Sequence, residues 1–169
     1  LLATITLDLT KAILIGAFLS GAVFLNTIAT LEVEVTEVEP EKLRQKGIET
    51  AGKCRHVRVA FLTGPLFFAA TGQFNEAFSK LGDTHALILS MRGVPLIDTS
   101  GLEAIHRLYE KIHAKGGTLM FSGVHENAMT MMQRGGLMEH IGEENFFWAS
   151  DEAIVEAERR GCSFCETNA

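Results

Sequence analysis

The residues best suited to chemistry lie at a turn between an apolar segment and an amphipathic helix. They are Asp98, Thr99, Ser100 and Gly101. The apolar segment Val94–Ile97 predicts the end of a strand, and residues 101–114 predict a helix. The turn therefore places two hydroxyls and a carboxylate at a helix N-terminus, where free N–H groups and the helix dipole favour anions. A phosphorylation switch or an anion contact is the chemistry that this position allows.

A purely structural interpretation of the same turn stays open beside the functional one. Asp, Thr and Ser are favoured residues at helix N-caps, and Gly101 permits a tight turn. A hydroxyl on Thr99 or Ser100 would also accept a phosphate, which adds roughly −1.5 to −2 charge and changes the surface that a partner meets. The two interpretations are compatible.

The other polar residues do not indicate catalysis. A nucleophilic hydroxyl needs a histidine base, and His106 follows Thr99 on the same helix at a spacing that directs it elsewhere. The sequence has no Gly-x-Ser-x-Gly, phosphate-loop or His-Glu-x-x-His motif. Cys162 and Cys165 have metal or redox spacing, but no second Cys/His pair accompanies them. We therefore predict that the chain is not an enzyme and has no catalytic residue, metal site or cofactor.

A second candidate surface is an aromatic turn after the first apolar run of the domain. Its residues are Gly64, Pro65, Phe67 and Phe68. Two aromatic side chains at a strand-to-helix turn can form an exposed contact for a partner. Packing of the same side chains into the core is the alternative, and the sequence leaves both open.

Strands and helices alternate from residue 57 onward. Apolar runs predict strands at 57–62, 86–91, 94–97 and 118–122, with a short strand or turn at 146–148. Helices are predicted at 66–81, 101–114, 126–134 and 152–160. Ser150 is the expected N-cap of the last helix. This alternation is typical of an α/β domain with a mainly parallel central sheet.

The N-terminal part of the chain is strongly apolar. Residues 12–29 carry no charge, and at helical rise they span roughly 27 Å, close to the hydrocarbon thickness of a bilayer. Gly16 and Ser20, like Ala17 and Gly21, are four residues apart, and such small side chains let membrane helices pack closely. We predict a transmembrane helix within residues 1–30. A buried soluble helix and a signal peptide are the alternatives.

Charge and composition divide the remaining chain. The formal net charge of −6 over 169 residues, with no run of Lys or Arg, argues against a nucleic-acid partner. Residues 31–53 predict a linker with a possible first strand, because residues 31–38 alternate apolar and acidic. Residues 54–160 predict the folded domain, and residues 161–169 a polar tail. Basic residues after the apolar helix favour the cytoplasm for the domain.

The folded part resembles a STAS domain, which anti-sigma-factor antagonists share with the C-terminal domains of SulP (sulfate permease) anion transporters. The segment Ile97–Leu102 is similar to the signature loop of that family. Three further segments resemble the SulP branch: Gly64–Phe68, Leu119–Gly123 and Ile141–Phe147. Upstream, Leu7–Thr10 at the start of the apolar helix resembles the last membrane span of those transporters.

The resemblance implies a mixed, mainly parallel sheet flanked by helices and preceded by one transmembrane helix. It implies the C-terminal part of a transporter for sulfate, bicarbonate or a similar inorganic anion, in the cell (inner) membrane with the STAS domain in the cytoplasm. The implied partners are the transporter's membrane domain, a second copy through the full transporter, and a regulatory protein or kinase. The antagonist branch implies the alternative, a signalling switch phosphorylated after the loop aspartate, at Thr99.

Overall fold

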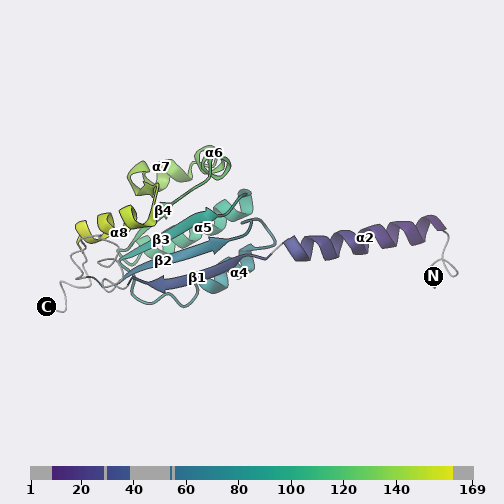
Figure 1. Ribbon diagram of the computed structural model, residues 1–169, viewed down its shortest axis with the longest axis horizontal. Helices are drawn as coiled ribbons and strands as arrows, with labels where there is room; N and C mark the ends of the chain where they lie inside the picture. The colour runs from purple at the N-terminus through teal and green to yellow at the C-terminus, as the bar shows by residue number, and fades with distance from the viewer. Residues whose placement is uncertain (1–8, 29, 39–53, 55, 162–169) are drawn as a thin grey trace.

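The computed structural model describes residues 9–28, 30–38, 54 and 56–161 (Figure 1). Within these described residues, five strands form a single sheet in the order β1-β2-β3-β4-β5. The strands are β1 (Glu32–Glu37), β2 (Val57–Thr63), β3 (Ala86–Gly93), β4 (Thr118–Ser122) and β5 (Phe146–Phe147). β1 runs antiparallel to β2, and the other neighbours are parallel. The prediction of a mixed, mainly parallel sheet is therefore confirmed.

The helices among the described residues are α2 (Leu9–Ile28), α4 (Thr71–Ala77), α5 (Thr99–His113), α6 (Glu126–Arg134), α7 (Leu137–Ile141) and α8 (Ser150–Arg159), with a 3₁₀ turn η1 (Glu143–Asn145). Helices α4 to α8 cover the two faces of this sheet, while α2 extends away from it (Figure 1). Successive side chains of a strand point to opposite faces, so the apolar runs of β3 and β4 supply two cores. The larger core joins the sheet to α4–α7, and the smaller joins it to α8.

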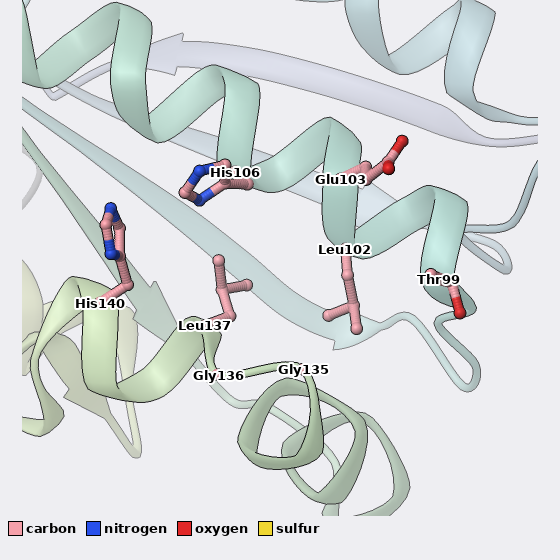
Figure 2. A pocket seen from close by; sticks show the side chains of 8 residues that line it. All are labelled: Thr99, Leu102, Glu103, His106, Gly135, Gly136, Leu137 and His140. Atoms are coloured by element: carbon pink, nitrogen blue, oxygen red, sulfur yellow. The ribbon is translucent and has the colours of Figure 1, made fainter.

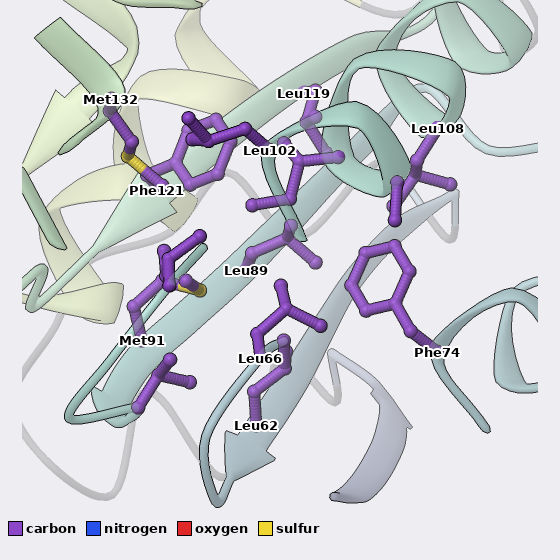
Figure 3. Packing of buried hydrophobic residues seen from close by; sticks show 14 of the residues in the cluster. Leu62, Leu66, Phe74, Leu89, Met91, Leu102, Leu108, Leu119, Phe121 and Met132 are labelled. Carbon is purple, nitrogen blue, oxygen red and sulfur yellow. The ribbon is translucent and has the colours of Figure 1, made fainter. Parts of the chain in front are cut away.

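Figure 3 shows the larger core, where Leu89 and Phe121 of the central strands meet Leu102 and Leu108 of α5. Phe74 of α4 closes the same cluster and is fully buried. On the opposite face, Ile154 and two alanines of α8 pack against small and branched side chains of β2 and β3. Burial of both faces explains why β3 is buried along six consecutive positions, five of them apolar, rather than alternating.

Three predicted elements differ from the observed ones. The helix expected over 66–81 is shortened to Thr71–Ala77, because Leu66 is bonded to the segment before α5 and residues 68–70 form a turn. Val94–Ile97 is not a strand and contributes one isolated parallel bridge, between Ile97 and Leu66. Ser150 does not cap α8: it is the first helical residue, and its hydroxyl bonds that of Ser122 at 2.8 Å.

The predicted first strand exists as β1, while the rest of the predicted linker, from residue 39 to residue 53, lies outside the described residues. Cys162 and Cys165 in the predicted tail also lie outside them. Among the residues that the structure describes, no helix is both long and apolar enough to cross a membrane. The transmembrane helix predicted within residues 1–30 therefore stays a prediction.

The C-terminal end of α8 is tied to the turn before β5 by one arginine. Arg160 donates to the side-chain oxygen of Asn145 at 2.6 Å and to the carbonyl of Glu144 at 3.0 Å. Its Nε also donates to Glu156 at 2.9 Å, and Arg159 donates to the same carboxylate from two nitrogens. These hydrogen bonds from the two arginines lower the pKa of Glu156 from 4.5 to about 2.

A lowered pKa in the folded chain predicts a stability contribution that is complete above pH 4.5 and is lost as the pH falls towards 2. We expect Glu156→Gln to remove this contribution, so that the free energy of unfolding depends less steeply on pH in that window. Urea unfolding across the window measures both slopes. Glu158→Gln, on the same helix, is the matched control. Equal slopes for the wild type and Glu156→Gln would contradict the assignment.

Candidate functional site

The predicted switch loop is organised by the carboxylate of Asp98. One oxygen accepts a hydrogen bond from the backbone N–H of Gly101 at 2.8 Å, which caps α5. The other oxygen accepts the backbone N–H of Phe68 at 3.1 Å. The predicted N-cap role is therefore confirmed. The same side chain also holds the aromatic turn at Phe68, which lies 30 residues earlier in the chain.

Backbone bonds reinforce this link between the two loops. The N–H of Leu66 donates to the carbonyl of Leu96 at 2.9 Å, and the N–H of Asp98 donates to the carbonyl of Leu66 at 3.2 Å. Leu66 and Ile97 are thereby paired in parallel, with both side chains buried. Hydrogen bonds therefore join the switch loop directly to the aromatic turn.

Gly101 is required by close packing rather than by a special backbone conformation. A Cβ at this position would collide with the carbonyl oxygen of Leu66 and would crowd the side chain of Ile97. The described chain has positive φ angles at six glycines, and Gly101 is not among them. The sequence interpretation of Gly101 as a tight-turn residue is therefore replaced by a contact between α5 and the aromatic turn.

The aromatic turn divides between core and surface. Leu66 is fully buried, and Phe67 is half-buried against the larger core. Phe68 is 62% exposed, and its ring meets that of Phe67 edge-on at a centroid distance of 5.3 Å. Gly64 and Pro65 are half-buried. Within this turn, Phe68 is thus the aromatic side chain that a partner can reach, while Phe67 is occupied by packing.

The two hydroxyls of the switch loop differ in access. Thr99 is the first residue of α5 and is exposed, while Ser100 is half-buried. Figure 2 shows Thr99 at one end of a groove between α5 and the turn joining α6 to α7. The groove has a volume of about 330 Å³ and is lined by Thr99, Leu102, Glu103, His106, Gly135, Gly136, Leu137 and His140.

The opposite end of the groove holds a polar group that the sequence analysis missed. The rings of His106 and His140 lie 4.8 Å apart between centroids, and both approach the carboxylate of Glu110. His106 was recognised only as a base that points away from Thr99, and Figure 2 agrees with that orientation. His140 comes from α7, 30 residues beyond Glu110, so no local spacing indicates the cluster. The i, i+4 spacing of His106 and Glu110 was the one available signal.

The sheet order, the capped loop before α5 and the helices on both faces define the class of protein. Residues 48–153 match the model of the STAS domain family. The chain belongs to the STAS domain family, and within it the chain is related to the STAS domains of sulfate transporters.

Proteins named as sulfate transporters are among the curated relatives of this chain. The chain is 23% identical over 130 residues to the putative sulfate transporter YbaR of Bacillus subtilis. The matched region is 77% of this chain and 24% of that protein. It is 35% identical over 68 residues to the probable sulfate transporter 4.2 of Arabidopsis thaliana, a region that is 40% of this chain and 10% of that protein. The chain thus spans no more than about a quarter of these relatives.

Solved structures share this fold. A sulfate transporter family protein from Wolinella succinogenes is 30% identical with a TM-score of 0.58, covering 66% of this chain and 94% of that one. The murine anion transporter Slc26a9 gives a TM-score of 0.72 at 21% identity, covering 94% of this chain and 27% of that one. An anti-sigma factor antagonist from Mycobacterium paratuberculosis shares the fold at 14% identity, covering 78% of this chain and 96% of that one, with a TM-score of 0.56.

The packing at Gly101 predicts a stability cost for any side chain there. We expect Gly101→Ala to lower the free energy of unfolding by about 1–3 kcal/mol, because the added methyl group meets the Leu66 carbonyl, which the backbone pairing holds in place. Gly72→Ala is the matched control, since a Cβ there meets nothing, and it should be neutral or stabilising by up to about 1 kcal/mol. Denaturant unfolding measures both. A wild-type value for Gly101→Ala would refute the contact.

The two roles of Asp98 predict separable effects. Asp98→Asn retains one oxygen for the cap but cannot accept the N–H of Phe68, whereas Asp98→Ala loses both bonds. We expect faster amide hydrogen exchange at Phe68 in both variants and at Gly101 only in Asp98→Ala, which should also lose about 1 kcal/mol of stability from the cap. Unchanged exchange at Phe68 in both variants would show that the carboxylate does not hold the aromatic turn.

Proposed function

We propose that this chain is the C-terminal part of a SulP-type transporter of inorganic anions such as sulfate or bicarbonate. Its STAS domain regulates or assembles the carrier on the cytoplasmic side of the cell membrane. The observation that carries the proposal is a helix with a largely exposed apolar surface, joined to a STAS domain. Figure 1 shows α2 extending away from the sheet.

The side chains of α2 support a place beside other apolar segments. Those of Leu14, Phe18 and Val23 are between 64% and 77% exposed. Apolar surface costs roughly 25 cal/mol per Å² when it stays in water, so a helix of this kind needs neighbours or lipid. A Cβ at Gly16 or Gly21 would meet nothing, so this surface is open to close approach by another helix. We assign that place to helices of the transporter's membrane domain, with residues 1–30 belonging to it.

The similarity to Slc26a9 supports the same arrangement. A match over 94% of this chain extends beyond the STAS domain and takes in residues of α2. In this proposal the STAS domain follows directly on the membrane domain, and two copies of the carrier associate through the full transporter. The exposed groove beside Thr99 and the exposed ring of Phe68 are then surfaces for a regulatory protein.

A signalling switch is the second candidate function. The observation that favours it is the accessible hydroxyl of Thr99 at the start of α5, directly after the loop aspartate. Phosphate at that position would lie near the free N–H groups of a helix start and would add charge at the end of the groove. In this alternative the chain is an antagonist that binds a kinase partner while unphosphorylated.

The gene around this sequence distinguishes the two functions. We expect about ten further apolar spans to be encoded upstream of Leu1, and anion uptake by membrane vesicles that contain the complete product. Removal of residues 54–160 from that product should alter uptake or the amount of assembled carrier. A start codon within a few residues of Leu1 would overturn the transporter proposal and leave the signalling switch.

Thr99 provides a test of regulation within the complete carrier. We expect Thr99→Glu to leave the fold intact, because the side chain is exposed and an acidic group at a helix start adds up to about 1 kcal/mol of stability. The added charge should change uptake or the binding of a regulatory partner severalfold. Ser79→Glu, an exposed site near the end of α4, controls for charge alone, and Thr99→Val controls for loss of the hydroxyl. Unchanged uptake and unchanged partner binding in Thr99→Glu would exclude a switch at this residue.

A further inference from the structure

We propose that His106, Glu110 and His140 form a binding site for a divalent zinc-like metal ion at the end of the groove opposite Thr99. One candidate ligand atom from each residue lies within 4.8 Å of the other two. The ligands come from two elements, because His106 and Glu110 are one turn apart on α5 and His140 stands on α7. This site is independent of the proposed transport function.

The distances are close to those of a tetrahedral zinc site. Bonds of 2.0–2.1 Å place neighbouring ligand atoms about 3.3 Å apart. His140 Nε2 already lies 3.3 Å from Glu110 Oε1. His106 Nε2 lies 4.0 Å from the same oxygen and has to approach it by about 0.7 Å. The side chains of all three residues are between 46% and 58% exposed, so small changes of rotamer can make this adjustment.

The donor set favours zinc over calcium or magnesium. Two imidazole nitrogens are borderline ligands that suit zinc, and zinc also accepts one carboxylate oxygen, whereas calcium and magnesium prefer oxygen alone. Three protein ligands leave the fourth tetrahedral position for water, for an anion or for a side chain of a partner. The exposure of the three side chains also means that an ion reaches them directly from solvent.

The surroundings of the site restrict its histidines. The ring of Tyr109 meets the ring of His140 edge-on at a centroid distance of 5.3 Å, and it lies stacked with the ring of His106 at 6.5 Å. Tyr109 is half-buried and packs against the larger core, so it provides a fixed surface for both imidazoles. A metal ion held there would join α7, which has only five residues, to the middle of α5.

The test uses the complete chain in detergent with Cys162→Ser and Cys165→Ser, because tail thiolates would compete for the metal. Calorimetric titration with Zn²⁺ should show one site, and zinc should raise the melting temperature. His140→Gln and Glu110→Gln should each raise the dissociation constant for Zn²⁺ by roughly 100-fold or more. Even residues that only hydrogen-bond to metal ligands contribute about 10–100-fold to metal affinity. His113→Gln, farther along α5 and outside the cluster, should bind as the parent does.

Co²⁺ absorption gives a second readout, which should report four-coordinate nitrogen and oxygen ligation in the parent and should disappear in His140→Gln. Melting temperatures without metal verify that each variant is folded. The proposal is overturned if the parent binds no Zn²⁺, or if a folded His140→Gln variant binds it as tightly as the parent. It is also overturned if His113→Gln weakens binding as much as His140→Gln does.

Discussion

The carboxylate of Asp98 accepts two backbone hydrogen bonds, one from the N–H of Gly101 and one from the N–H of Phe68. One bond starts α5, and the other fixes the loop that follows β2. Because α5 packs on the centre of the sheet through Leu102 and Ile105, the position of its first turn determines how the larger core closes. The absence of a side chain at Gly101 then allows α5 to lie directly on the Leu66 carbonyl. The predicted switch loop therefore also has a structural role, because it connects α5 to the loop after β2. A change at its exposed residue, Thr99, occurs beside backbone that these contacts hold in place.

Helix α5 connects the two polar ends of the groove. Thr99 stands at its first residue, and His106 and Glu110 follow two and three turns later on the exposed side, while the opposite side is buried. The apolar stripe of α5 is buried in the larger core from Leu102 to Ile112. Thr99 and two residues of the proposed metal site, His106 and Glu110, therefore belong to one helix, and Figure 2 shows Thr99 and His106 lying apart on it.

The sequence predicted most of this fold because its patterns are local. The apolar runs that became β2, β3 and β4, and the amphipathic segments that became α5 and α6, each carry their own periodicity. The mixed sheet and its flanking helices followed from the alternation and the family resemblance, and they are confirmed. Residues 66–70 were assigned to a helix by their apolar content, but tertiary backbone bonds to residues 96 and 98 hold them as a loop. For the candidate site, the cap at Asp98 was predictable from residue type. The bond to Phe68 and the approach of His140 were not, because each joins residues 30 positions apart.

The two edge strands of the sheet, β1 and β5, affect how copies of this domain can associate. β1 carries Glu32, Glu34 and Glu37 on a largely exposed strand, and β5 at the other end has only two residues. If two copies paired their β1 strands, rows of like charge would face each other across the new ladder. The short β5 offers too few free backbone groups to begin such a ladder. Growth of the sheet from one molecule into the next is thereby disfavoured, which protects a high local density of these domains against aggregation through strand pairing.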